Sequence, residues 1–185
     1  PRSNTKSKKL TVLQQQILQQ DCAEIMLKGD VIAIDPSVGS ASSSMGYSVW
    51  QAGVLRDAGV IEIPVEWSNP RKLQEIRKSL QGEFDSVDVL VIENIAPTRG
   101  GKGGGRFINK AWKTLHQATG AAIASVDCEY TVEVSPASWH ALARRAEGYQ
   151  KSDTADAVMI GYTALYNAAQ ILDTEPPSMV FIVEE

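Results

Sequence analysis

The sequence predicts an α/β layer fold built on one mixed β-sheet, and three patterns lead to this prediction. The first is an apolar run that ends on a carboxylate, "VIAID" at Val31–Asp35, followed by two further strand-like runs. The second is the almost wholly apolar "DVLVIE", typical of a strand that is covered on both faces. The third is a series of helical segments alternating with short strands after residue 107. A strand meander followed by such alternation favours a mixed sheet.

The composition fits one domain with a single substantial core. The chain has 185 residues, of which 43% are hydrophobic. We expect residues 1–29 to form a basic tail and an amphipathic N-terminal helix, and residues 30–185 to form the domain. Cys22 and Cys128 are far apart and lack metal-type spacing, so free thiols in a reducing compartment are the simplest interpretation. No apolar run approaches the roughly 20 residues that span a bilayer, and no secretory signal is visible. We therefore expect a cytoplasmic protein with no membrane partner.

The elements can be placed in chain order. Apolar residues recur at three- and four-residue steps from Leu10 to Met26, which predicts one amphipathic helix that packs on the domain, with a partner contact as the alternative. Strands are predicted at 31–35, 46–50 and 54–63, a helix at 69–80 capped by Asn69, and the buried strand at 88–93. Helices are then predicted at 107–119, 136–145 and 153–172, with short strands at 131–134 and 179–183. Gly120 is expected to end the first of these helices and Ser152 to cap the last.

Four carboxylates occupy positions where they can meet. Asp35 ends the first strand, and Glu93 ends the buried strand. Asp153 and Asp156 lie three residues apart at the start of the last helix, a spacing that puts both on one helical face. If the two strands are neighbours, their ends lie about 5 Å apart. Four converging acids repel one another unless cations neutralise them, and hard oxygen ligands suit Mg²⁺ or Mn²⁺.

Each acid also has an ordinary structural explanation. Asp35 before a proline is a common turn initiator, and Glu93 can pair with a basic neighbour. Asp153 and Asp156 are acids of the kind that a helix dipole favours in the first turn. Singly, none of the four indicates a site. Their ordered combination favours a metal centre.

A basic segment lies between the second and third of these acids. Residues 94–126 contain five basic residues and no acid, which fits a basic contact surface beside an acidic site. A solvated helix face is the alternative explanation. The segment begins with "NIAPTRGGKGGGRF", whose five glycines predict an irregular loop.

With these motifs in place, the sequence resembles the ribonuclease-H-like nucleases, and within them the RuvC-type Holliday-junction resolvases. The resemblance covers roughly residues 31–170. It rests on "IAIDPSVGSASSSMGYSVW" as an opening hairpin, "VLVIENIAP" as the strand with its glutamate, "TLHQATGAAIASV" as the following helix, and "VEVSPASWHALARRAEGYQKSDTADAVMIGYTAL" as a proline-started helix followed by D-x-x-D-A. The glycine-rich loop is longer than in bacterial members, and the helix at Leu10–Met26 has no recognised counterpart.

The resemblance implies a fold and a reaction. The fold is a ribonuclease-H-like mixed five-stranded sheet, an antiparallel meander of strands 1–3 plus parallel strands, flanked by helices. The reaction is that of a crossover junction endodeoxyribonuclease, which cuts four-way (Holliday) DNA junctions by paired metal-dependent nicks that leave 5′-phosphate and 3′-hydroxyl ends. The catalytic residues would be the four acids, holding two Mg²⁺ ions (Mn²⁺ as the alternative) per active site, with Asp35 shared by both ions.

Two further residues near the acids have open roles. Lys151 could neutralise charge that develops on the phosphate, and an exposed lysine at a helix start is an equal alternative. His140, beside Trp139, is expected to pack within the fold, with a secondary role in the site as the alternative.

The same resemblance implies a DNA-binding surface and a homodimer, because a four-way junction needs two symmetric incisions. The predicted helix at 107–119 is the candidate two-fold contact. Phe107 could stack on unpaired bases at the branch point, or be the first core residue of its helix. The residues expected to contact DNA are Arg99, Lys102, Arg106, Phe107, Lys110, Lys113, Arg144 and Arg145.

Other functions stay open at this point. The main alternative is another ribonuclease-H-like nuclease that acts on general or branched DNA or on RNA–DNA hybrids. The second is a non-catalytic branched-DNA-binding protein, although four acids beside phosphate would weaken a pure binder. Actin-like phosphotransferases need a second related domain, which 185 residues do not supply. The expected host is a bacterial or phage-infected cell, with an organelle as the alternative.

Overall fold

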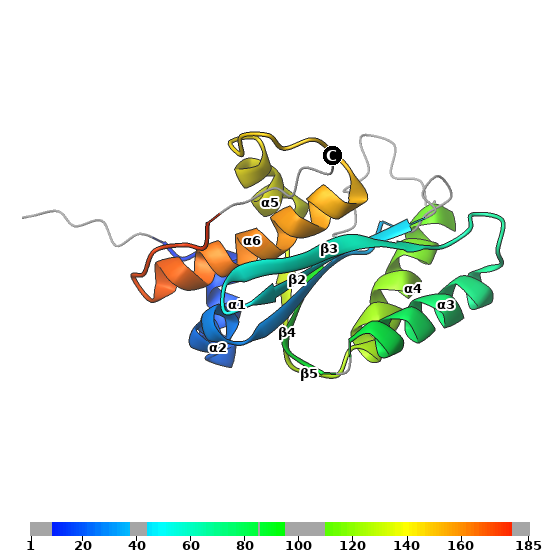
Figure 1. Ribbon diagram of the computed structural model, residues 1–185, viewed down its shortest axis with the longest axis horizontal. Coiled ribbons are helices and arrows are strands. Elements are labelled where there is room, and N and C mark those ends of the chain that lie inside the picture. Colours follow the sequence, from blue (N-terminus) through cyan, green and yellow to red (C-terminus); the bar gives the residue numbers. More distant parts are fainter. Residues whose placement is uncertain (1–8, 38–43, 85, 95–109, 179–185) are drawn as a thin grey trace, which may run out of the picture.

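The computed structural model describes residues 9–37, 44–84, 86–94 and 110–178, and its centre is one five-stranded sheet (Figure 1). The strands are β1 (Asp30–Asp35), β2 (Ser44–Gln51), β3 (Val54–Glu62), β4 (Val87–Glu93) and β5 (Cys128–Val134). They lie in the order β3-β2-β1-β4-β5. The first three form an antiparallel meander, and β4 and β5 run parallel to β1. The predicted mixed sheet is therefore confirmed.

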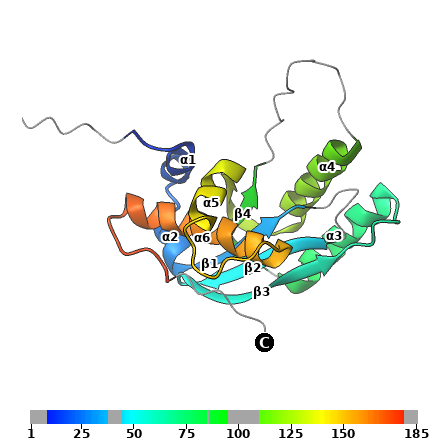
Figure 2. The same ribbon diagram turned by 90° about the horizontal axis from the view of Figure 1, so that it is seen from above.

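Helices cover both faces of the sheet (Figure 2). One face carries α1 (Val12–Gln20), α2 (Ala23–Lys28), α5 (Pro136–Ala143) and α6 (Asp153–Ile171). The other face carries α3 (Asn69–Glu83) and α4 (Lys110–Ser125). Among the described residues, no helix combines the length and the apolar character needed to cross a membrane.

The sheet separates two hydrophobic cores because strand side chains alternate between its faces. In β1, Val31 and Ala33 pack with α6, whereas Ile32 and Ile34 pack toward α3 and α4. All four side chains are fully buried. This burial on both faces explains why β1 is an uninterrupted apolar run, and it places Asp35 at the point where the run ends.

The predicted helix over Leu10–Met26 is two helices rather than one. The break lies at Asp21, whose φ of 54° is in the left-handed region, and its N–H bonds back to the last turn of α1. The change of direction lets both Ile17 and Met26 reach the core, where neither is exposed. The segment thus packs on the domain, as its periodicity predicts.

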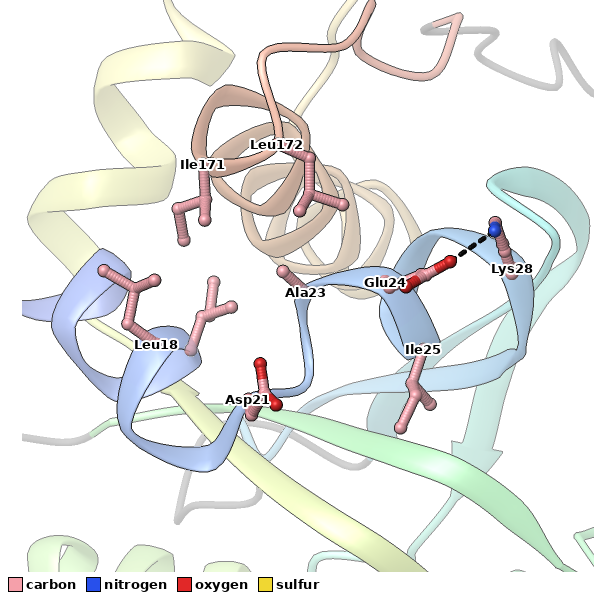
Figure 3. A pocket seen from close by; sticks show the side chains of 9 residues that line it. Leu18, Asp21, Ala23, Glu24, Ile25, Lys28, Ile171 and Leu172 are labelled. Atoms are coloured by element: carbon pink, nitrogen blue, oxygen red, sulfur yellow. Dashed lines mark hydrogen bonds and ion pairs between the residues drawn. The ribbon is translucent and has the colours of Figure 1, made fainter.

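A hollow of about 490 Å³ lies where α1, α2 and the end of α6 meet (Figure 3). Leu18 and Leu172 line it and stay substantially exposed, while Glu24 and Lys28 form an ion pair beside it. This hollow is at the C-terminal end of α6. The predicted acids Asp153 and Asp156 are at the other end of the same helix.

Several predicted boundaries are wrong. Gly120 does not end its helix, because α4 continues to Ser125. Ala118 and Ala122 are fully buried on either side of it, and their packing offsets the roughly 1 kcal/mol that glycine costs inside a helix. Ser68, not Asn69, precedes α3, and β5 begins at Cys128. The predicted strand at 179–183, the glycine-rich loop and the first residues of the helix predicted from 107 lie outside the described residues.

The edge of β5 is covered by side-chain amides of α1. Gln16 donates from Nε2 to the carbonyl oxygen of Glu133 (3.2 Å), and its Oε1 accepts from the Glu133 N–H (3.1 Å). Gln20, one helical turn on, donates to the carbonyl oxygen of Thr131 (3.0 Å). An open strand edge is a template for pairing with other chains. The glutamines of α1 occupy this edge in the way that a neighbouring strand would.

We expect Gln16→Ala to expose this edge, because Glu133 loses both of its backbone hydrogen bonds to α1. Stability should fall by about 1 kcal/mol, and amide hydrogen exchange at Glu133 should accelerate. Gln15→Ala is the matched control, because Gln15 bonds only locally, to the carbonyl of Leu10. Equal exchange at Glu133 in both variants would contradict the edge-covering role.

Candidate functional site

Two of the predicted acids come together because β1 and β4 are parallel neighbours. Ile34 lies opposite Ile92 in the register of these strands, so the next residues, Asp35 and Glu93, reach the same end of the sheet. Asp35 is 4% exposed and Glu93 is half-buried. The topology alone therefore places two carboxylates side by side at the carboxyl-terminal ends of the central strands.

The other two acids project from the first turn of α6. Ser152 caps this helix, and its Oγ accepts from the Ala155 N–H (3.1 Å), as the sequence predicts. Asp153 and Asp156 then fall in the first turn. The hydroxyl of Ser44, at the start of β2, donates to Asp153.

Gly46 on β2 allows this turn to lie close to the sheet. It is the register partner of Asp35, and a Cβ at this position would collide with the carbonyl oxygen of Asp153. Any larger residue would push the start of α6 away from the end of β1.

Burial and the repulsion between carboxylates raise the pKa of three of these acids, Asp35, Glu93 and Asp156. Removal from water is the largest cause for Asp35, and the charges of Glu93, Asp156 and Asp153 add to it, so that its pKa rises to about 8. Burial likewise raises the pKa of Glu93 and of Asp156. The four carboxylates thus share one electrostatic environment with an excess of negative charge.

Two aromatic residues that the sequence does not single out bond to these acids. The indole N–H of Trp139 donates to Oε1 of Glu93 (2.7 Å), and the hydroxyl of Tyr149 donates to Oδ1 of Asp156. The hydrogen-bond partner of Glu93 is therefore an aromatic side chain. The alternative explanation for this acid was an ion pair with a basic neighbour. The available signal was that a buried tryptophan N–H needs an acceptor, but the sequence does not say which acceptor it finds.

His140 lies on the surface rather than within the packed fold. It is exposed, its ring centroid is 3.9 Å from that of Trp139, and its charge acts to lower the pKa of both Glu93 and Asp156. His140 thus packs against Trp139 at the surface, and its secondary role in the site stays a prediction.

The donor set fits a divalent cation. All four acids offer carboxylate oxygens, which Mg²⁺ and Mn²⁺ prefer. Burial and the charges of the other three acids raise the pKa of Asp35, and a bound cation would offset both effects. Within the described ranges, no three His, Cys, Asp or Glu side chains are grouped closely enough to hold a metal ion as they stand. The role of these acids as metal ligands stays a prediction.

The remaining predicted residues are placed in part. Lys151 is exposed, and its charge acts to lower the pKa of Asp156. Arg144 and Arg145 are exposed just after α5, and Lys113 is exposed on α4. Lys110 is placed only as the first residue of α4, and four residues lie outside the described part of the chain: Arg99, Lys102, Arg106 and Phe107.

The sheet order and the helices on both faces define a ribonuclease-H-like fold. No family model and no curated protein sequence matches the chain. Among solved structures, the chain is similar to T. thermophilus RuvC in complex with Holliday junction substrate, with a TM-score of 0.55 and 15% identity over 80% of this chain and 98% of that chain.

Two further structures give the same result. Another Thermus thermophilus RuvC structure has a TM-score of 0.50 and 15% identity, over 80% of this chain and 99% of that one. The yeast mitochondrial Holliday junction resolvase Ydc2 has a TM-score of 0.53 and 12% identity, over 89% and 96%. At these identities the likeness establishes the fold. It confirms the predicted resemblance to RuvC-type resolvases at the level of structure.

We expect Asp35→Asn to stabilise the metal-free protein at high pH. Because the folded-state pKa of Asp35, about 8, lies above its ordinary value of 3.8, the stability that this carboxyl contributes is present at low pH and is lost as the pH rises toward 8. In EDTA, the variant should gain on the order of 3 kcal/mol over wild type at pH 8 and much less at pH 4. Denaturant unfolding at both pH values measures this. Asp127→Asn, at an exposed aspartate, is the control, and a gain independent of pH would refute the assignment.

We expect Gly46→Ala to displace the start of α6, because the added methyl group collides with the backbone of Asp153. The cost should be about 1–3 kcal/mol, as for other overpacked sites. Gly120→Ala, where an added Cβ has no atom within 4 Å, should instead be neutral or stabilising by up to about 1 kcal/mol. Denaturant midpoints of the two variants test the contrast, and equal midpoints would count against the close approach.

Proposed function

We propose that this protein is a divalent-metal-dependent endodeoxyribonuclease that resolves four-way DNA junctions by paired nicks. The observation that carries the proposal is the convergence of Asp35, Glu93, Asp153 and Asp156 at one end of a RuvC-like sheet. Four acids in one partly buried place destabilise the protein unless a cation balances them. Such a cost is typical of a functional site rather than of a structural one.

Each of the four acids, together with Lys151, has a separate role in such a reaction. Asp35 is the most buried of the four acids, and the charges of the other three act on its carboxylate. It is therefore the candidate ligand shared by two ions. Glu93 approaches from β4, and Asp153 and Asp156 approach from α6. When bound, Mg²⁺ or Mn²⁺ ions activate a water molecule and stabilise the leaving oxygen of a phosphodiester. Lys151, exposed just before α6, can neutralise charge on the phosphate.

Branched DNA is the substrate that the fold relatives suggest, because the T. thermophilus RuvC structure is a complex with a Holliday junction. Arg144, Arg145 and Lys151 are exposed around the segment that leads into α6, where they can contact phosphates. We include the basic loop residues in this surface on the strength of the sequence. Symmetric incision of a junction requires a homodimer, with α4 as the candidate contact. The compartment follows from the function, as the DNA-containing space of a bacterial or phage-infected cell or of an organelle.

The decisive experiment is cleavage of a labelled synthetic four-way junction beside linear duplex and RNA–DNA hybrid controls. With Mg²⁺ we expect paired nicks confined to the junction, whose 5′-phosphate and 3′-hydroxyl ends a DNA ligase can reseal, and no nicks with EDTA. Preferred cutting of duplex or hybrid would favour the alternative nuclease, and binding without cutting would favour a branched-DNA binder.

Asp35→Asn should abolish cutting and retain junction binding, because it removes the shared metal ligand and leaves the exposed basic residues unchanged. Gel-shift and cleavage assays with the same junction measure the two effects separately. Asp127→Asn should behave as wild type in both assays. Cutting by Asp35→Asn at the wild-type rate would remove Asp35 from the site.

A further inference from the structure

Two aromatic side chains from one segment, residues 135–152 between β5 and α6, bond to two of the four acids. Trp139 on α5 donates to Glu93, and Tyr149 in the following loop donates to Asp156. The two acids lie on different elements, β4 and α6. The segment therefore connects both sides of the site through hydrogen bonds to its carboxylates.

The placement of Trp139 follows from the parallel pairing of β4 and β5. Glu93 is the register partner of Val134, so α5, which starts at Pro136, begins beside the end of β4. Ser135 fixes this start, because its Oγ accepts from the Ser138 N–H (3.3 Å). Trp139 is 3% exposed, and a buried indole N–H must find an acceptor. It engages Oε1 of Glu93, so a cation can be bound through Oε2.

The placement of Tyr149 follows from a turn at Gly148. The φ of Gly148 is +80°, a conformation that other residues rarely adopt, and it leads directly into Tyr149. The hydroxyl of Tyr149 is thereby placed to donate a hydrogen bond to Asp156. It engages Oδ1, and Oδ2 can be turned toward a cation.

We propose that Trp139 and Tyr149 are positioning residues that each hold one oxygen of an acid, Glu93 and Asp156 respectively, and thereby aim the other oxygen at the metal site. This inference rests on the proposed metal-dependent function. Neutral donors suit the task, because a lysine or arginine in the same place would neutralise the acids and compete with the metal. Outer partners of this kind raise metal affinity by fixing the orientation of each ligand.

Tyr47 is a matched control for the tyrosine bond. It donates from its hydroxyl to Oδ2 of Asp57 (3.3 Å), and its ring packs with the core on the α3 and α4 face. Tyr47→Phe removes the same atom as Tyr149→Phe, but none of the four acids loses a partner.

The test is isothermal titration of each protein with Mn²⁺ in the absence of DNA. Trp139→Phe and Tyr149→Phe should each bind Mn²⁺ about tenfold more weakly than wild type. Tyr47→Phe should stay within about twofold, even where its unfolding midpoint falls, because a purely structural role does not change affinity. Unchanged affinity in folded Tyr149→Phe and Trp139→Phe would overturn the proposal. Tyr149→Phe decides alone if Trp139→Phe does not fold, because it deletes a single oxygen from a half-buried side chain.

A second readout uses junction cleavage at rising Mn²⁺ concentration. High Mn²⁺ should restore the cleavage rate of Trp139→Phe and Tyr149→Phe, but not that of Asp35→Asn, and KM for the junction should be unchanged. A rate that high Mn²⁺ fails to restore would contradict positioning through the metal.

The two levels of proposal fail in different ways. If wild type binds Mn²⁺ and Asp35→Asn does not, while both aromatic variants bind normally, the positioning role is refuted and the metal centre is supported. If wild type binds no Mn²⁺, the metal centre falls and the positioning role falls with it. If metal binding behaves as expected but no nucleic acid is cut, the nuclease assignment fails and the positioning role survives.

Discussion

The close packing of α6 against the centre of the sheet is the contact on which the candidate site depends. At Gly161 an added Cβ would collide with the indole nitrogen of Trp50, so the middle of the helix lies almost on the strands. Ser48 Oγ donates to the carbonyl oxygen of Ala157 (2.9 Å) and accepts from Trp50. A buried polar contact of this kind has few alternative arrangements. It therefore fixes the position of α6, along the helix axis, relative to β2. The first turn, with its two acids, then has one position above Gly46.

The packing of α6 offsets the loss of stability that the buried acids cause. Every residue of α6 from Asp156 to Leu165 is buried, because the sheet covers one side of the helix and α1, α2 and α5 cover other sides. Each large apolar side chain taken out of water contributes about 1.5–3 kcal/mol. Burial of Asp35 acts in the opposite direction, as its raised pKa shows. The unfavourable charges sit only at the ends of β1, β4 and α6, outside both hydrophobic cores. The fold can therefore carry an electrostatically strained site without losing its packing.

The sequence predicts the parts of the site that follow from strand and helix ends, and it misses those that depend on tertiary placement. Asp35 and Glu93 end apolar runs, so their meeting needs only a parallel pairing of β1 and β4. The break at Asp21 was missed because one left-handed residue does not disturb the apolar periodicity. The partner of Trp139 was missed because 46 residues separate the tryptophan from Glu93, and local patterns carry no information about such a pair. The bond from Tyr149 to Asp156 was missed because it depends on the path of the loop between α5 and α6.

The side chains that donate hydrogen bonds to the acids differ in charge from the basic side chains of the neighbouring segment. In the part of the chain that the structure describes, every hydrogen-bond donor found on the four acids from a side chain is neutral: Ser44, Trp139 and Tyr149. Lys151, whose charge acts on Asp156, is exposed, as are Arg144 and Arg145 in the segment between α5 and α6. An ion pair within the site would neutralise a carboxylate and exclude a metal, whereas a neutral donor orients it and leaves its charge in place. Internal neutral donors with external cations therefore favour a site where a divalent ion meets the acids and a phosphate backbone meets the surrounding basic residues.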